Sequence, residues 1–176
     1  MKTKQTITIY VVRILLIMLT LSLLWFIFSN ATADGEASSE QSYSVTITVQ
    51  EVVGAIDPDS PIATATGEDF DILHACVRDA AHLLQYLALG AAAFGTYLSF
   101  VNREKWGFAY IPPCFLFLTA ATDEYMQTLT AGRAAEFSDL AVDCTGALIG
   151  IAFAFFVYGI VLLIALRRRK ACHGRS

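Results

Sequence analysis

Four apolar stretches, each long enough to cross a lipid bilayer as a helix, dominate this sequence of 176 residues. The hydrocarbon core of a bilayer is about 30 Å thick, so a helix needs roughly 20 mostly apolar residues to cross it. The stretches run over residues 9–28, 82–101, 106–125 and 146–166. We therefore predict an all-α integral membrane protein with four transmembrane helices, the third of them kinked at Pro112-Pro113.

The composition excludes several other classes of protein. Apolar residues make up 56% of the chain and charged residues 16%, against about 45–50% and about 25% in soluble domains. A disordered chain, an ordinary water-soluble enzyme and a nucleic-acid-binding protein are excluded, so we expect no nucleic-acid partner. The cysteines, Cys76, Cys114, Cys144 and Cys172, lie far apart with no C-x-x-C pair. We predict neither a zinc framework nor a disulfide framework, and no cofactor.

Basic residues between the apolar stretches predict the topology. They occur before the first stretch, between the second and the third, and after the fourth, as Lys2, Lys4, Arg103, Lys105 and the run from Arg167 to Lys170. With four spans all of these fall on one side, which the positive-inside rule makes the cytoplasm. Residues 1–8 and 171–176 are then cytoplasmic ends, and residues 29–77 form an extracytoplasmic loop. Between residues 30 and 77 there are nine acidic residues and no Lys or Arg.

The first apolar stretch has a second interpretation. Lys2 and Lys4 before it and Ala31-Thr32-Ala33 after it resemble a cleavable signal peptide. The stretch is longer than a usual signal-peptide core, and Trp25 and Phe26 are typical of an interfacial anchor. We therefore favour an uncleaved helix.

The extracytoplasmic loop is the hardest part to interpret. Residues 43–50 alternate apolar and polar side chains, a strand pattern, but a short surface helix or a hairpin with Val52-Val53 remains open. The segment from Asp57 to Pro61 predicts a turn. Acidic residues favour a helix N-terminus, so Glu68 or Asp69 is expected to begin a helix that continues into the second span.

Counting residues from the basic ends of the spans brings polar side chains from three helices to one depth. At 1.5 Å per residue, these side chains lie at or near the outer edge of the hydrocarbon. They are Arg78, His82, Asp123, Glu124, Gln127, Asp139 and Asp143, with Arg133 in the connection between the last two spans. His74, Arg78 and His82 recur every four residues and so share one helix face, although His74 is expected above the bilayer in water. Gly146 and Gly150 form a G-x-x-x-G pair, which we expect to pack against another helix of this same chain.

These polar residues are candidate ligand-binding residues. Four carboxylates, those of Asp123, Glu124, Asp139 and Asp143, face two arginines, Arg78 and Arg133. This imbalance leaves room for a cationic ligand, a metal ion or a protonated carboxyl group. Ionisable groups inside a membrane indicate function by default, while a buried network that only fixes helix packing is the alternative. The arginine guanidinium groups suit a phosphate or carboxylate headgroup.

Catalysis and metal binding receive less support from the pattern. His82 and Glu124 are the candidates for proton transfer, and the sequence does not decide whether the protein is an enzyme. His82, Glu124, Asp139 and Asp143 have the ligand types for a metal site. They come from separate helices without a local spacing signature, so we predict no metal site.

One set of residues resembles a known family. The pattern Asp123-Glu124-x-x-Gln127-x-Leu129-x-x-Gly132-Arg133, followed by Asp139-x-x-x-Asp143-x-x-Gly146-x-x-x-Gly150, resembles the signature of the VanZ-like family, which is named for a teicoplanin-resistance protein. Arg78-x-x-x-His82 with Tyr86, and Phe28-Ser29-Asn30, are similar to other elements of that family. Asp79 stands where the family usually has Lys, and Leu129 where it usually has Phe. The resemblance makes residues 78–170 a VanZ-like region of three helices.

The resemblance implies a bacterial cell-envelope protein linked to resistance to lipid-bearing glycopeptides. The expected partners are the bilayer itself and an anionic lipid, either a phospholipid or a lipid-linked cell-wall precursor. A lipid-phosphate hydrolase or transferase and a non-catalytic scaffold are the alternatives. The sequence gives no indication of the oligomeric state.

Overall fold

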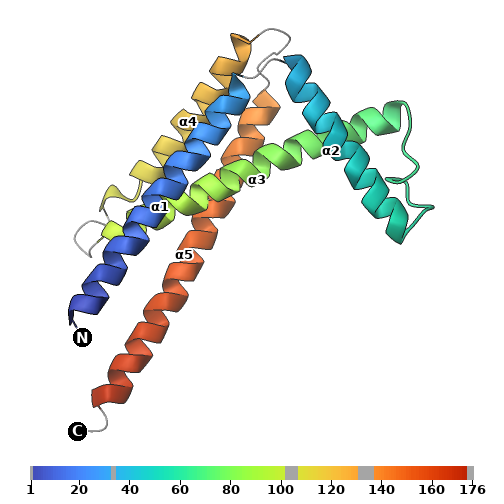
Figure 1. Cartoon of the computed structure of the whole chain (residues 1–176). Coiled ribbons are helices and arrows are strands. Elements are labelled where there is room, and N and C mark those ends of the chain that lie inside the picture. The colour runs from blue at the N-terminus through green and yellow to red at the C-terminus, as the bar shows by residue number, and fades with distance from the viewer. Residues whose placement is uncertain (1, 33–34, 102–106, 131–136, 174–176) are drawn as a thin grey trace.

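The computed structural model describes residues 2–32, 35–101, 107–130 and 137–173. These residues form five helices and, within the described ranges, no strand, which confirms the all-α prediction. The helices are α1 (Lys2–Ala31), α2 (Gly35–Ile56), α3 (Glu68–Phe100), α4 (Ile111–Thr128) and α5 (Phe137–His173). In Figure 1, α1, α3, α4 and α5 form a bundle, and α2 lies against the N-terminal part of α3.

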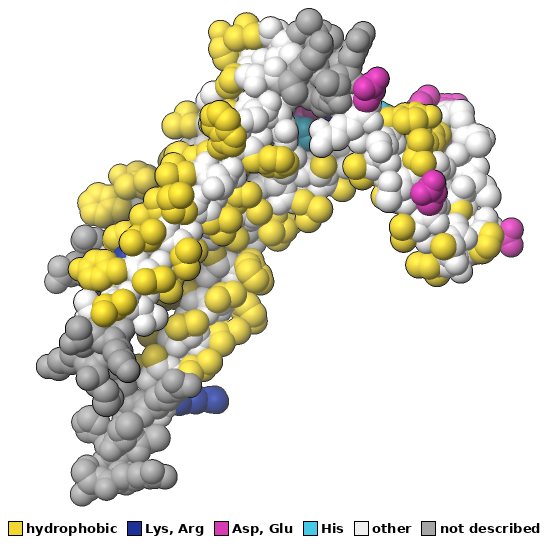
Figure 2. Space-filling view, in the orientation of Figure 1, with side chains coloured by type: hydrophobic (Ala, Val, Ile, Leu, Met, Phe, Trp, Pro, Cys, Tyr) yellow, Lys and Arg dark blue, Asp and Glu magenta, His cyan; other side chains and the backbone are white. Residues whose placement is uncertain are grey.

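Three of these helices are long and apolar enough to cross a membrane. They cover Thr6–Ala31, Glu68–Phe100 and Phe137–Arg167. Helix α4 has 18 residues, and its second half contains Asp123, Glu124 and Gln127, which lower its apolarity. Apolar side chains cover the visible surface of the bundle, whereas the acidic side chains gather around α2 and the start of α3 (Figure 2). An apolar surface of this extent is suited to contact with lipid.

Among the helices that the structure describes, α3 and α5 make the most extensive contact. The two helices run in the same direction, because Leu83 and Leu87 of α3 lie against Gly146 and Gly150 of α5 in the same order. A Cβ atom added at either glycine would overlap the carbonyl group of the facing leucine. The G-x-x-x-G pair therefore packs within the chain, as predicted, and allows the two backbones to touch.

Helix α1 is fixed to α3 by polar contacts near the end of the bundle that holds the N-terminus. The Nε and Nη2 atoms of Arg13 donate to the carbonyl oxygen of Ser99 at 3.0 Å and 2.7 Å. The guanidinium group also lies 4.4 Å from the ring centroid of Phe100. A cation at the C-terminal end of α3 offsets the negative end of the helix dipole and satisfies a terminal carbonyl group.

Residues 43–50, whose alternating pattern also allowed a strand, lie within the helix α2. Of the open alternatives, the helix is correct, but α2 spans 22 residues and is not short. Thr46 and Thr48 tolerate the helix because their hydroxyl groups donate to the carbonyl oxygens of Ser42 and Ser44 one turn earlier. The predicted turn lies after α2, where the backbone N–H of Asp59 donates to the carboxylate of Asp57 at 3.3 Å. Helix α3 begins at Glu68, as expected.

The third apolar stretch differs from its prediction. Helix α4 begins at Ile111, so Pro112 and Pro113 lie in its first turn and do not kink a longer helix. Proline has no backbone N–H, and the first turn of a helix has no partner for that group, so proline is well placed there.

The glycine contact predicts a difference between two alanine substitutions in α5. A methyl group at Gly150 must displace the backbone of α3, whereas nothing lies within 4 Å of a Cβ at Gly159. We expect Gly150→Ala to destabilise the protein by about 1–3 kcal/mol and Gly159→Ala to leave its stability unchanged or slightly raised. Thermal unfolding of the purified protein in detergent measures both, and equal melting temperatures would contradict this packing.

Candidate functional site

The parallel contact between α3 and α5 continues from the glycines into two polar pairs. Arg78 Nη2 lies 3.5 Å from Asp139 Oδ2, and one turn further along His82 Nδ1 lies 3.2 Å from Asp143 Oδ1. Residues four apart on each helix share a face, so the second pair follows directly from the register of the first. The structure therefore places four of the candidate residues together.

A third pair connects α3 to α4. Tyr86 follows His82 by four residues, and its hydroxyl group donates to Asp123 Oδ2 at 3.3 Å. Tyr86 is fully buried in the apolar core beside Leu89 and Ala120. The hydroxyl group thus holds the carboxylate of Asp123 against the same face of α3 that carries His82.

The carboxylates of the site are removed from solvent. The exposed fraction is 0% for Asp143, 3% for Asp123 and 7% for Asp139. A buried carboxylate is unfavourable unless it is paired or hydrogen-bonded. Within the part of the chain that the structure describes, Asp143 Oδ2 is buried and has no hydrogen-bond partner, since His82 bonds the other oxygen of that carboxylate.

Three of these side chains converge on one point. Nitrogen and oxygen atoms of His82, Asp123 and Asp143, one from each residue, all lie within 4.8 Å of one another. Each residue comes from a different helix, α3, α4 or α5. This convergence is the chemical centre of the site.

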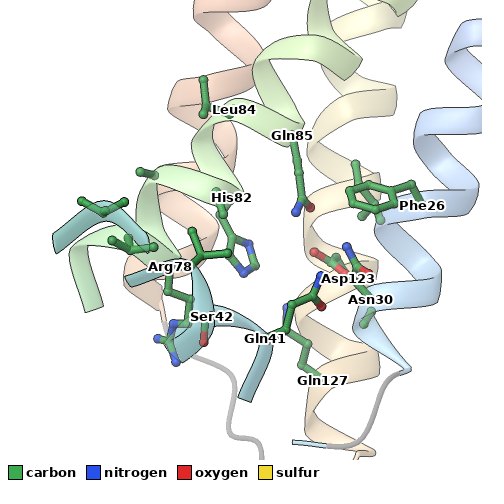
Figure 3. A pocket seen from close by; sticks show the side chains of 17 residues that line it. Phe26, Asn30, Gln41, Ser42, Arg78, His82, Leu84, Gln85, Asp123 and Gln127 are labelled. Atoms are coloured by element: carbon green, nitrogen blue, oxygen red, sulfur yellow. The ribbon is translucent and has the colours of Figure 1, made fainter. Parts of the chain in front are cut away.

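A cavity of about 380 Å³ lies beside this centre. Its wall is formed by side chains of α1, α2, α3 and α4. In Figure 3, His82, Gln85 and Asp123 point toward a common space, Asn30 reaches in from α1, and Arg78 lies at the edge beside Ser42. The remaining wall is largely apolar and includes Phe26, Ile27, Val45, Val49 and Leu84. The cavity thus combines an apolar wall with one polar end.

Two further candidates occupy different positions. Glu124 is buried. Its Oε1 accepts a hydrogen bond of 3.4 Å from Nε2 of Gln127, which lies about one turn later on α4. Gln127 lines the cavity, and Glu124 is not among the lining residues. Arg133 lies outside the described residues, so the structure does not place this candidate.

The expectation that His74 is solvated is wrong. Its Nε2 lies 2.7 Å from Ser42 Oγ, and its ring contacts Tyr43 and Phe70. His74 is half-buried because α2 folds back along α3 and covers it.

Cys76, Cys114 and Cys144 are free thiols.

Sequence reasoning did not assign every residue of the site. Tyr86 was noted only as part of the family resemblance, although it continues the four-residue spacing of Arg78 and His82 and so could have been placed with them. Gln41 and Ser42 line the cavity from α2. Nothing in their local sequence indicates this, because it depends on how α2 packs.

The arrangement is suited to two kinds of chemistry, proton transfer and metal ligation. In both, a carboxylate that bonds one nitrogen of a histidine fixes the orientation of the ring. His82 is held in this way by Asp143 and lines the cavity. A cation or a proton donor at this position would meet a ligand at the polar end of the cavity.

Comparison with known proteins identifies the family. No curated protein and no solved structure matches the chain. A sequence model of the VanZ/LLP1 family matches residues 15–168, a range that includes every residue of the polar pairs and of the cavity wall. This match confirms the resemblance found from the residues. The chain belongs to the VanZ/LLP1 family.

Proposed function

We propose that this VanZ/LLP1-family protein binds the anionic headgroup of a membrane lipid in the cavity beside His82 and Asp123. The observation that supports the proposal best is the form of the cavity, which joins an apolar wall to a polar end. An amphipathic ligand with an acyl or prenyl chain matches both parts. A phospholipid and a lipid-linked cell-wall precursor share this chemistry. The precursor would also account for the link to glycopeptide resistance that the family resemblance implies.

Arg78 is the residue that we assign to the headgroup. Among the described residues that line the cavity, Arg78 is the one with a permanent positive charge. Its side chain is 47% exposed, and its ion pair with Asp139 uses Nη2 at 3.5 Å. A guanidinium group has five N–H donors in a planar fork, so donors remain for a phosphate oxygen. We assign the same role to Arg133. Asp139 would orient Arg78, Asp143 would orient His82, and Glu124 would hold Gln127, whereas Asp123 and Gln127 line the cavity and would contact sugar or amine groups.

We also propose that α4 crosses the membrane, which makes four spans. Helices α3 and α5 run in the same direction, so the chain must return across the bundle between them. Helix α4 lies between them in sequence and is about 27 Å long at 1.5 Å per residue. Its carboxylates would lie at the end of the span, where Tyr86 and Gln127 bond them.

The same arrangement supports a cytoplasmic position for both termini. The start of α1 and the end of α5 lie at the same end of the bundle in Figure 1, and the acidic side chains gather at the opposite end in Figure 2. Residues 29–77 would then be extracytoplasmic. Helix α1 would stay attached, since Ile27 and Ala31 are buried and Thr130 Oγ1 donates to the carbonyl oxygen of Ala31.

A membrane enzyme is the second candidate function. It is favoured by the His82–Asp143 pair at the cavity, which has the geometry of an oriented general base. His82 is the better of the two candidates for proton transfer, because Glu124 is bonded within its own helix and does not line the cavity. In a lipid-phosphate hydrolase, His82 would take a proton from a water molecule, whose oxygen attacks the phosphorus. The bond from phosphorus to the lipid oxygen breaks, the lipid alcohol leaves with a proton, and inorganic phosphate is released.

The topology predicts a contrast in chemical labelling. In a variant whose native cysteines are replaced, Asp59→Cys should react with a membrane-impermeant maleimide in intact cells, because residue 59 lies in the exposed turn after α2. Thr3→Cys should react only after the cells are opened. Labelling of Thr3→Cys from outside would contradict the proposed orientation.

The headgroup assignment predicts a loss of bound lipid in one of two matched variants. Native mass spectrometry in mild detergent should detect a phospholipid or prenyl-phosphate species on the wild-type protein. Arg78→Lys keeps the charge but loses the fork, and should retain at least about tenfold less, since a hydrogen bond to a charged group contributes about 1.5–3 kcal/mol.

Arg167→Lys is the control, because Arg167 lies at the opposite end of α5 from the polar pairs. It should retain lipid as the wild type does. Equal lipid retention by both variants would contradict the headgroup assignment. Failure of Arg78→Lys to accumulate in membranes would contradict it as well.

A further inference from the structure

We propose that His82, Asp123 and Asp143 bind a divalent transition-metal ion whose open coordination positions face the cavity. The imidazole nitrogen and the two carboxylate oxygens lie within 4.8 Å of one another. The proposal differs from the metal set considered from sequence, since Glu124 and Asp139 lie outside this cluster of described residues. The metal site itself depends only on these residues, and its role toward a headgroup rests on the proposed function.

The distances between the ligand atoms fit a metal ion that replaces the proton shared by His82 and Asp143. Ligand atoms lie about 2.0–2.2 Å from Zn²⁺, which puts two ligands of one ion roughly 3–3.5 Å apart. His82 Nδ1 and Asp143 Oδ1 are already 3.2 Å apart. Asp123 offers an oxygen within 4.8 Å of the ligand atoms of the other two residues, and a rotation of its side chain would bring this oxygen closer.

The charge of the site also fits a divalent ion. Two buried carboxylates with a protonated histidine leave a net charge of about −1 in a region shielded from water, which is unfavourable. Two carboxylates, a neutral histidine and a divalent cation sum to zero. Arg78 does not neutralise this centre, because it pairs with Asp139 and is half exposed.

A separate observation points to a ligand at the same place. The carboxylate of Asp143 is 0% exposed, and among the described residues its Oδ2 has no hydrogen-bond partner. Such an oxygen is normally satisfied, because leaving it unpaired costs about 1–3 kcal/mol or more for a charged group. A metal ion bound beside Oδ1 would lie within reach of Oδ2 as well.

The surrounding residues support the ligands as they do in known metal sites. Carboxylate ligands are usually held by hydrogen bonds from an outer shell of residues. Tyr86 plays this part for Asp123, donating from a fully buried hydroxyl group at 3.3 Å. The phenol holds the carboxylate in place without supplying a competing charge.

The donor set indicates the class of ion and its use. Imidazole with carboxylates suits Zn²⁺ or Mn²⁺, whereas Mg²⁺ and Ca²⁺ prefer oxygen ligands alone. Three protein ligands leave at least one position open, and His82 and Asp123 both line the cavity. A phosphate oxygen of the headgroup would bind at that open position, in the cavity that Arg78 also lines.

Metal binding by the full-length protein in detergent, after removal of metal with EDTA, tests the proposal. Isothermal titration with Zn²⁺ and with Mn²⁺ should show one site for at least one of the two ions, and Mg²⁺ should bind far more weakly. Asp143→Asn should reduce the affinity by about 100-fold or more, since even outer-shell partners contribute 10–100-fold. Asp71→Asn, which removes an exposed carboxylate from α3, should bind as the wild type does.

A second variant keeps the outcome decisive. If Asp143→Asn does not fold, Tyr86→Phe replaces it. This variant removes one hydrogen bond to Asp123, so it should lower the affinity by about 10-fold and lower the melting temperature only by the loss of that one bond. Absence of a site for both Zn²⁺ and Mn²⁺, equal binding of Mg²⁺, or equal affinity in the Asp143→Asn and Asp71→Asn proteins would overturn the proposal.

Lipid retention of the metal-loaded and EDTA-treated proteins separates this site from the proposed function. A loss of lipid on EDTA treatment supports both proposals. Stoichiometric metal binding with lipid retention unaffected by EDTA leaves the metal site in place and overturns its role toward the headgroup.

Discussion

The close approach of two parallel helices is the constraint on which the site depends. Gly146 and Gly150 let α5 touch the backbone of α3, and no larger residue fits there without displacing that backbone. The register set by these contacts carries on toward the start of α5, where Asp143 meets His82 and Asp139 meets Arg78. Packing of small residues thus decides which charged groups meet, in a setting where apolar side chains give little specificity.

The parallel register has a consequence for the rest of the chain. Two helices that run the same way need a return segment, and α4 is the helix between them in sequence. This explains why a helix with buried carboxylates is kept in an otherwise apolar bundle. Asp123 reaches the face of α3 that carries His82 and Tyr86. The residues that make α4 less apolar are among those that build the polar centre.

Much of this arrangement could be predicted from the sequence, because depth in a bilayer follows from counting residues. The count placed Arg78 and His82 at the level of Asp139 and Asp143, and the structure pairs them. It could not separate Asp123 from Glu124. Neighbouring residues on a helix point about 100° apart, so which one meets α3 depends on how α4 is rotated. The pattern of residues 43–50 left strand, helix and hairpin open for a similar reason, since the environment of α2 is set by its contact with α3.

A double-mutant cycle on His82 and Asp143 tests the central claim most directly. Melting temperatures in detergent would be measured for the wild type, His82→Leu, Asp143→Leu and the double variant. If the two side chains are paired inside the bundle, each single change leaves a buried polar group alone, and the double variant loses clearly less stability than the two single losses added together. Losses that simply add would show that the two groups do not interact, and would contradict the account.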